Sequence, residues 1–259
     1  MHANKMKLYH YTKFSNFCSI WIQQKLKFSE WTNSNDVYER EKIYNFTQHS
    51  KEYKGKMFTS EVFHQFVQNV YKEVEHYKQI SFCLDYEEFE GYASPMMWGH
   101  YARDYQRSGV CLEIDSSKIK FPQIPKIYRK KVSYRKNLTP THVGGVDAEM
   151  KNAAELFVVK NRNNLFFKKH WHWKYENEYR IVSKECEELD ISGAITSVYV
   201  LGEDNVTLQS ISHIIMDSEK VGFLNVGGLR SLKLNSMNLY EYNSIQEEIK
   251  YINEKGGLS

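Results

Sequence analysis

The sequence predicts an α+β fold: a single domain over residues 1–259, with a central, mostly antiparallel split sheet and a helical insertion at about 37–78. Two observations predict this. Segments of strand length alternate irregularly with helical segments of unequal length, which fits an α+β domain better than a regular βαβ winding. Apolar residues make up 41% of the chain, enough for a core, and the four prolines form no linker that would divide it.

Several segments have the length and composition of strands. In the first, Leu8, His10 and Thr12 share one face, and Tyr9 and Tyr11 share the other, because successive side chains of a strand alternate. We therefore expect His10 to point into a polar cleft beside the core. The segments are 6–12, 26–29, 80–84, 110–114, 127–134, 195–201, 211–216 and 239–242.

Three stretches are predicted to be helical, besides a short helix after the first strand. Between about 37 and 78, apolar residues from Phe58 to Val74 recur at helical spacing and indicate an amphipathic helix. The stretch 95–105 begins with Pro95, which suits the first position of a helix. Residues 147–168 are predicted to form a longer helix.

The composition argues against several classes of protein. The net charge of +3 is too small to indicate a nucleic-acid-binding protein by itself. The four cysteines are scattered without a Cys-x-x-Cys pair, so neither a zinc site nor a disulfide framework is expected. No stretch approaches the roughly 20 apolar residues of a membrane span, and the first residues lack the apolar run of a signal peptide. We expect a reduced, soluble, cytoplasmic protein with no metal and no membrane contact.

The densest group of candidate functional side chains lies at 168–182. From Glu176 onward, alternation places Glu176, Glu178 and Arg180 on one face of an extended segment. Two close carboxylates raise each other's pKa, and an arginine counteracts this. An ion-pair cluster on a solvated face is the simpler alternative, but the flanking tryptophans favour a walled site. We expect Glu178 to be the catalytic acid, Glu176 its helper and Arg180 the group that keeps Glu178 ionised, with Trp173 closing one side.

Weaker candidates lie elsewhere. Trp98 and Tyr101 are three residues apart on one predicted helix and share a face. Core packing is the better interpretation for Trp98, whereas Tyr101 is a candidate to line a cleft. His170 and His172 form a pair without a third ligand at suitable spacing, so a metal site is not predicted.

Several motifs together resemble a family of bacterial proteins known only as a domain of unknown function. The resemblance covers about residues 7–202, and its most specific part is Trp-x-x-Glu-x-Glu-Tyr-Arg at 173–180. This chain has Val37 where the family usually has a proline after Asn-Asp. The matching pieces are Leu-Tyr-His-Tyr at 8–11, Leu-Lys-Phe-Ser at 26–29, Ser-Phe at 81–82, Met-Trp-Gly-His-Tyr-Ala at 97–102, Gly-Val-Cys-Leu-Glu-Ile-Asp at 109–115 and Trp-Lys-Tyr-Glu-Asn-Glu-Tyr-Arg at 173–180.

A more distant resemblance is to the ADP-ribosyltransferase fold, in its His-Tyr-Glu branch and in tRNA 2′-phosphotransferase-like and DarT-like relatives. The strand at 8–12, followed by a short helix and a second strand ending at Ser29, looks like the opening of that fold. The resemblance implies an NAD-dependent ADP-ribosyltransferase or NAD glycohydrolase, with a nucleic acid or a protein as acceptor, and a role as a bacterial toxin or phage-defence effector.

The same resemblance implies roles for residues. A late-strand glutamate, Glu178 or Glu176, acts at the reacting centre, His10 holds the adenosine-side ribose, and an aromatic ring stacks on nicotinamide. The residues implied to bind NAD as substrate are Tyr9, Tyr11, Thr12, Ser29, Trp98, Tyr101, Trp173 and Arg180.

Two other functions stay open. A basic run at 126–136 and many aromatic residues are compatible with a nucleic-acid-binding protein or a metal-independent nuclease, although a solvated face explains the run more simply. A non-catalytic interaction domain is the third alternative. The nucleotide cradles Gly-x-Gly-x-x-Gly and Walker A are absent from the sequence.

Overall fold

The computed structural model describes residues 6–40, 46–48, 52–53, 56–57, 59–87, 89–102, 109–124, 126–137, 141–143, 152–201, 222–226 and 229–233. The helices are α1 (Phe14–Gln23), α2 (Val37–Arg40), α3 (Ser60–Glu75), α4 (Pro95–Met97) and α5 (Ala153–Phe166). Four 3₁₀ turns, η1 (Trp31–Asn33), η2 (Gly91–Ala93), η4 (Ser116–Lys118) and η5 (Trp171–Glu176), and a π-helical turn, η3 (Trp98–Ala102), join them.

The strands of the main sheet are β1 (Lys7–Thr12), β3 (Ser29–Glu30), β7 (Lys78–Cys83), β8 (Val110–Asp115), β9 (Ile127–Lys131), β13 (Glu178–Ser183), β15 (Ile195–Leu201), β16 (Gly222–Val226) and β17 (Leu229–Lys233). Short strands outside it are β2 (Lys25–Lys27), β4 (Phe46–Gln48), β5 (Glu52–Tyr53), β6 (Lys56–Met57), β10 (Ser133–Arg135), β11 (Thr141–Val143), β12 (Lys168–His170) and β14 (Glu188–Asp190).

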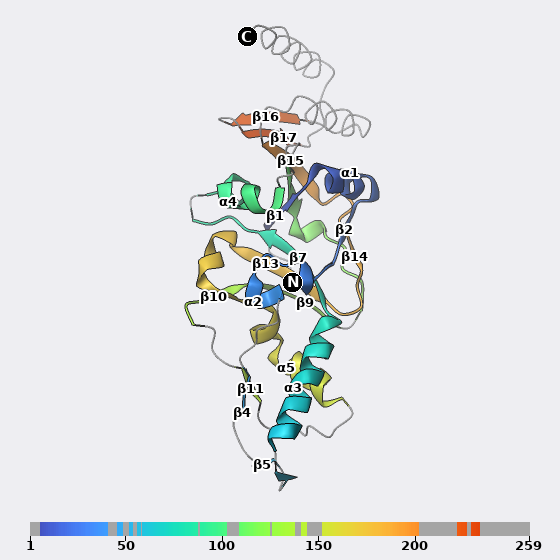
Figure 1. Cartoon of the computed structure of the whole chain (residues 1–259). Coiled ribbons are helices and arrows are strands. Elements are labelled where there is room, and N and C mark those ends of the chain that lie inside the picture. Colours follow the sequence, from blue (N-terminus) through green and yellow to red (C-terminus); the bar gives the residue numbers. More distant parts are fainter. Residues whose placement is uncertain are drawn as a thin grey trace.

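The main sheet has the order β16-β17-β15-β8-β1-β7-β13-β9, and β3 pairs with β7. Its strand pairs are antiparallel, whereas the small pairs β10–β12 and β4–β11 are parallel. Figure 1 shows the sheet across the upper and middle part of the molecule, with α3 and α5 side by side at its lower end. The predicted α+β fold with a mostly antiparallel sheet is confirmed.

The sheet is split between its two central strands. β1 pairs with β8 along all six of its residues, but with β7 only at Tyr9↔Cys83. At the other end of β7, the partner is β3, which pairs Ser29 with Gln79. β1 and β7 therefore separate beyond Tyr9, and the edge of β7 around Ser81 faces the split.

Both faces of the sheet are packed. Leu8 of β1 belongs to a buried cluster under α1, with Phe17 and Leu112. Tyr9 and Tyr11, on the opposite face, belong to a second cluster with Cys83, Met97 and Trp98. This distribution confirms the predicted alternation in β1, and it leaves His10 partly exposed beside the split.

The helices α3 and α5 form a third cluster. Thr59 Oγ1 accepts a hydrogen bond from Val62 N (3.3 Å) and caps α3. Phe66, Val70 and Val74 follow at intervals of four residues, so they form one buried stripe. Phe157 and Phe166 of α5 pack against this stripe.

The strand predictions are confirmed for 6–12, 26–29, 80–84, 110–114, 127–134 and 195–201, with two interruptions. The segment 127–134 divides into β9 and β10 at Val132, whose backbone N–H donates to Glu178 O (2.8 Å). The segment 26–29 divides into β2 and β3. The predicted strands 211–216 and 239–242, and residues 147–151 of the predicted third helix, lie outside the described residues.

Two helix predictions need correction. Within the predicted helical stretch, Phe46–Gln48, Glu52–Tyr53 and Lys56–Met57 form the strands β4, β5 and β6 between α2 and α3. Phe46 packs against Tyr71 of α3 (5.6 Å between ring centroids) and Phe157 of α5 (6.1 Å), so tertiary contacts decide this segment. The stretch beginning at Pro95 is helical as far as Ala102, but only α4 has α geometry, and Trp98 to Ala102 form the wider π turn. Residues 103–105 of this predicted helix lie outside the described residues. Among the described helices, none is both long and apolar enough to cross a membrane.

Candidate active site

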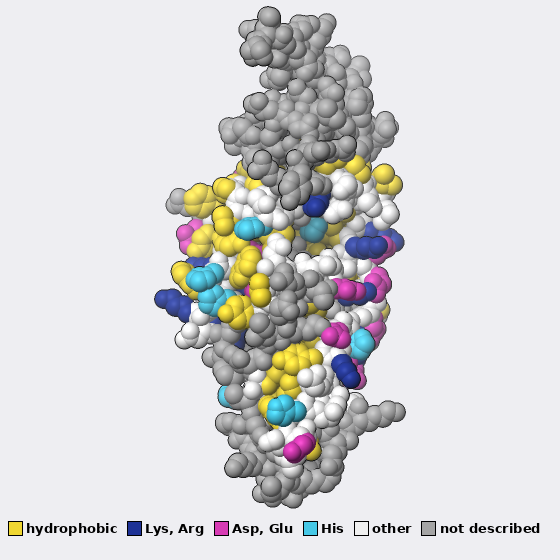
Figure 2. Space-filling view, in the orientation of Figure 1, with side chains coloured by type: hydrophobic (Ala, Val, Ile, Leu, Met, Phe, Trp, Pro, Cys, Tyr) yellow, Lys and Arg dark blue, Asp and Glu magenta, His cyan; other side chains and the backbone are white. Residues whose placement is uncertain are grey.

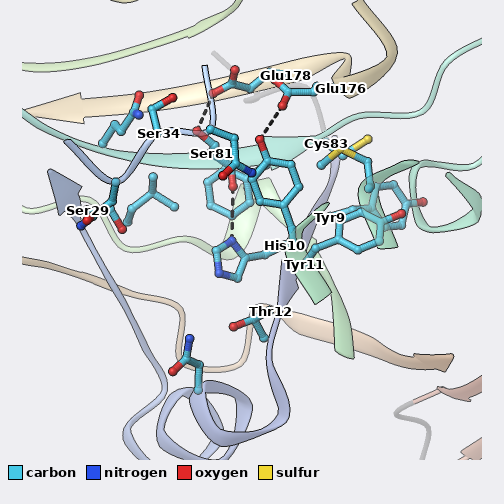
Figure 3. A pocket seen from close by; sticks show the side chains of 18 of the residues that line it. Tyr9, His10, Tyr11, Thr12, Ser29, Ser34, Ser81, Cys83, Glu176 and Glu178 are labelled. Carbon is cyan, nitrogen blue, oxygen red and sulfur yellow. Dashed lines mark hydrogen bonds between the residues drawn. The ribbon is translucent and has the colours of Figure 1, made fainter. Parts of the chain in front are cut away.

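A pocket of about 290 Å³ opens at the split between β1 and β7. Figure 3 shows that its side chains come from both strands and from the end of η5 and the start of β13. Of the residues predicted to act or bind there, Tyr9, His10, Tyr11, Thr12, Ser29, Tyr101, Glu176 and Glu178 line the pocket. The fold thus brings together residues from four separate parts of the chain, at 9–12, 29, 101 and 176–178.

Three predicted site residues do not line the pocket. Trp98 is buried behind Tyr11 with its ring centroid 5.1 Å away, and its indole N–H donates to Tyr92 O (2.7 Å). Trp173 lies over the Lys169 ammonium group, 5.2 Å from ring centroid to Nζ. Arg180 is fully buried behind Glu178. None of the three is placed for direct contact with a molecule in the pocket.

Glu178 is a fully ligated, buried carboxylate. Oε1 accepts hydrogen bonds from Arg180 Nε (2.6 Å) and from the Ser81 hydroxyl, and Oε2 accepts one from Arg180 Nη2 (2.7 Å) and lies 3.2 Å from Lys169 Nζ. These four donors fill the acceptor capacity of a carboxylate. Burial by itself would raise the pKa of Glu178, but the charges of Arg180 and Lys169 outweigh it and hold that pKa well below the usual range.

Arg180 joins the site to the rest of the fold. Its guanidinium binds Glu178 in a bidentate pair, donates from Nη1 to Phe166 O (2.8 Å), and lies 2.8 Å from Glu39 Oε1. Its Cζ lies 5.1 Å from the centroid of the Trp31 ring. The predicted role of Arg180 in keeping Glu178 ionised agrees with the direction of the Glu178 pKa.

Lys169 is the second buried cation. Its ammonium nitrogen lies 2.6 Å from Glu176, 3.2 Å from Glu178 and 3.7 Å from Glu39. The sequence pattern did not predict Lys169 and Glu39 as site residues. For Lys169 the signal was available, because it lies in the same segment as the two glutamates. For Glu39 no local signal exists, because it reaches the cluster from α2 only through the fold.

Glu176 reaches the same cluster from a different backbone position than predicted. It is the last residue of η5 and not part of the strand, because Asn177 adopts a left-handed conformation (φ 40°). The Asn177 side chain donates to Leu84 O (3.1 Å) and Asp85 O (2.7 Å), which stabilises this conformation. The predicted shared strand face is therefore correct for Glu178 and Arg180 and wrong for Glu176.

The surroundings of Glu176 push its pKa upward. Tyr101 Oη donates to Oε1 (2.5 Å), and Lys169 Nζ binds Oε2 (2.6 Å). Burial raises the pKa of Glu176; Lys169 opposes the shift, and the negative charge of Glu178 adds to it. Burial also raises the pKa of Tyr101, so its phenol stays protonated and able to donate. The two glutamates thus have pKa values shifted in opposite directions.

His10 presents to the pocket a ring nitrogen, Nε2, that has no hydrogen-bond partner among the described residues. Its Nδ1 lies 3.2 Å from Ser81 O, and a carbonyl only accepts, so Nδ1 carries the proton. Burial lowers the pKa of His10, which favours the neutral ring with Nε2 as an acceptor. Figure 3 shows this second nitrogen pointing away from Ser81.

Cys83 also lines the pocket, but burial raises the pKa of its thiol to about 12, which makes it a poor nucleophile.

Gln79 carries an unsatisfied acceptor in the pocket wall. The side chain is 7% exposed, and its Oε1 has no hydrogen-bond partner within the described structure. A buried acceptor without a partner costs about 1–3 kcal/mol, so this atom makes the pocket wall locally less stable. The pocket rim adds two exposed cations, Lys13 and Lys27. Among the described residues, no group of three or more His, Cys, Asp or Glu side chains is placed to hold a metal ion.

Residues 97–181 match a family model described as "Protein of unknown function (DUF2971)". The matched segment contains Tyr101, Lys169, Glu176, Glu178 and Arg180, and so one wall of the pocket. The other wall, which β1 and β7 provide, lies outside it, as do the predicted matching pieces before residue 97. No curated protein and no solved structure gives a significant match, so the resemblance to ADP-ribosyltransferases has no support from these comparisons.

The depressed pKa of Glu178 predicts a specific loss of stability in acid. A carboxylate with a folded-state pKa below its unfolded value, about 4.3, contributes stability above that value and loses it as the pH falls further. We expect the wild-type free energy of unfolding, measured by urea denaturation between pH 7 and pH 3, to fall below about pH 5. Glu178→Gln removes this titration and should show a shallower fall. Equal slopes in the two proteins would show that Glu178 is not held ionised.

Proposed function

We propose that this protein cleaves the N-glycosidic bond of NAD and passes the ADP-ribosyl group to water or to an acceptor. One observation carries the proposal. Glu176 and Glu178 lie at one pocket in different surroundings: Arg180, Lys169 and Ser81 hold Glu178 in its ionised form, whereas Glu176 meets the Tyr101 phenol and Lys169, and burial raises its pKa. A pair of carboxyl groups tuned in opposite directions is the arrangement that glycosidic cleavage uses.

In the proposed reaction, the bond between ribose C1′ and the nicotinamide nitrogen breaks, and its electron pair leaves with nicotinamide as a neutral molecule. The ionised Glu178, held in place by its four donors, stabilises the positive charge that develops on the ribose. Glu176, with its raised pKa, accepts the proton of the attacking hydroxyl as the new bond to C1′ forms. The low pKa of Glu178 makes it unsuitable as a proton donor near neutral pH, so within this proposal the acid–base role belongs to Glu176.

The pocket offers groups for the other parts of the substrate. His10 Nε2 is an acceptor for a ribose hydroxyl, and the rings of Tyr11 and Tyr101 are available for the nicotinamide. A volume of about 290 Å³ is at the lower end for ligand pockets. We therefore place the nicotinamide riboside half inside, with the diphosphate along the rim near Lys13 and Lys27.

Incubation with NAD tests the proposal directly. We expect NAD to raise the melting temperature of the wild type and nicotinamide to be released. His10→Ala should lower nicotinamide release about tenfold, the value of one lost hydrogen bond to a bound group, and it should reduce the NAD-induced rise in melting temperature, which follows the logarithm of the affinity. His64→Ala is the matched control, because its Nδ1 also lies near a backbone carbonyl, Ser60 O (2.7 Å), on the exposed side of α3. No thermal shift and no nicotinamide release at millimolar NAD would refute the proposal.

The biological role that fits this activity is that of a bacterial toxin or phage-defence effector, which consumes NAD or modifies an acceptor. Expression in growing bacteria should then arrest growth and lower cellular NAD, and Glu176→Gln should relieve both effects. Growth arrest that persists in a folded Glu176→Gln variant would contradict this role.

A further inference from the structure

A second group of polar and aromatic side chains lies outside the pocket, on the opposite face of β12. β12 alternates, so Lys169 points toward the buried carboxylates and its neighbours Lys168 and His170 lie on the other face. In the parallel pair β10–β12, Arg135 lies opposite His170. We call the exposed surface here the basic–aromatic patch; it consists of Tyr38, Arg135, Lys136, His170, Trp171 and His172.

The rings of the basic–aromatic patch form a connected series. Tyr38 stacks on His170 (6.4 Å between centroids, 25° between planes), and His170 meets His172 edge to face (4.5 Å). Trp171 follows at 6.0 Å from His172. Tyr38 and Trp171 are 49% and 45% exposed, so each keeps part of its ring surface accessible although Tyr38 stacks on His170 and Lys136 lies over Trp171. Contiguous exposed aromatic rings mark interaction sites more often than isolated ones do.

Positive charge accompanies these rings. Lys136 Nζ lies 5.7 Å from the centroid of the Trp171 ring. Arg135 lies near Lys168, and burial together with this like charge lowers the pKa of Lys168. Among the described residues, neither Arg135 nor Lys136 forms an ion pair with a carboxylate. Figure 2 shows histidine and basic side chains together at the left edge of the molecule, at the level of β10 and the following turns in Figure 1.

The rest of the basic run at 126–136 does not belong to this surface. Lys126 pairs with Glu155, Arg129 lies over the Phe121 ring (4.3 Å), and Lys130 donates to Asn163 (3.2 Å). Of the run, the last two residues, Arg135 and Lys136, lie beside the rings of the basic–aromatic patch. The basic run therefore does not act as one uniform basic strand. Its end forms a compact surface that combines accessible rings with cations.

We propose that the basic–aromatic patch binds single-stranded nucleic acid. Planar ring faces stack on unpaired bases, and neighbouring cations contact the phosphates between them, which is how proteins hold single strands without sequence preference. A duplex does not offer its base faces, so the exposed rings favour a single strand. Acidic proteins complement the charge but make no equivalent use of the stacked rings.

Fluorescence anisotropy with a labelled single-stranded oligonucleotide, with no NAD present, tests the proposal on the full chain. We expect binding at low salt that weakens steeply as salt rises. Trp171→Ala should weaken it about tenfold to a hundredfold, as the loss of one stacked base does. Lys136→Ala should lower the slope of log affinity against log salt by about 1. Phe89→Ala, which removes another exposed ring (69%), is the control and should change nothing.

Three outcomes would overturn the proposal. The first is that no oligonucleotide binds at low salt, and the second is that single strand and duplex bind with equal affinity and Trp171→Ala has no effect. The third is that a polyglutamate peptide binds in place of the oligonucleotide and that this binding depends on Trp171. The last outcome would make the basic–aromatic patch a protein-binding surface. If Trp171→Ala does not fold, Trp171→Phe and Tyr38→Ala replace it. Because NAD is absent, failure of this experiment is distinct from failure of the proposed enzymatic function.

Discussion

Arg180→Ala is expected to destabilise the protein by about 3–5 kcal/mol, the cost of removing one partner from a buried ion pair. The arginine is 1% exposed, and its removal leaves Glu178 without its bidentate partner and leaves Glu39 with the more distant Lys169 (3.7 Å) as its cation. It also leaves the Phe166 carbonyl without its donor. Since a typical domain has only about 5–15 kcal/mol of stability, the variant should be barely folded at 25 °C.

Urea denaturation at pH 7 measures this effect. Lys131→Ala on the neighbouring strand β9 is the control, because Lys131 is exposed and a surface substitution stays within about 0.5 kcal/mol. Arg180→Lys should fall between the two, since lysine keeps the charge but not the planar fork that binds both carboxylate oxygens. A loss below about 1 kcal/mol for Arg180→Ala would show that the buried cluster reorganises easily, and that Arg180 is not its central connection.

Glu176→Gln is expected to lower NAD turnover about a hundredfold to ten-thousandfold, the range for a positioned general base, while the protein stays folded. Burial raises the pKa of Glu176 and so favours its neutral form, which glutamine resembles. Tyr101 can still donate to the amide oxygen, and Lys169 keeps Glu178 and Glu39 as partners. Nicotinamide release and the melting temperature, measured on the same preparation, separate the two effects.

The pH dependence of kcat/KM shows whether Glu176 accepts a proton in the reaction or has only a structural role. A general base acts in its ionised form, so wild-type kcat/KM should rise with pH through the raised pKa of Glu176. Tyr101→Phe removes a hydrogen bond that lowers this pKa, so the rising limb should move to higher pH. Turnover per folded molecule that is unchanged in Glu176→Gln would refute the assigned role, and so would a profile that Tyr101→Phe leaves in place.

The structure also changes the expectation for Glu178. From the alternation of the sequence alone, Glu178→Gln is expected to remove the charge of Glu178 at little cost to folding. Its four donors, two of them on Arg180, instead make Glu178→Gln a destabilising change, because two buried cations lose a shared partner. Loss of activity in Glu178→Gln alone therefore does not establish a catalytic role, and the Glu176 variants carry that test.

Local pattern was enough for part of this protein. The alternation in β1 and the two-residue spacing of Glu178 and Arg180 depend only on the strand period, and the structure contains both. The stripe of α3 follows from the helical period in the same way. Composition and the spacing of segments also determined the α+β class, because they set how many short strands and unequal helices must share one core.

Only the tertiary structure decided the site. The divergence of β1 from β7 opens the pocket, and it depends on β3 taking over one end of β7. Glu39 joins the cluster from α2, and Asn177 turns Glu176 into it through contacts with Leu84 and Asp85. The physical reason is the same in each case: a buried charge or backbone group must find a partner, and the fold supplies one from wherever the chain passes, at sequence separations that no local period records.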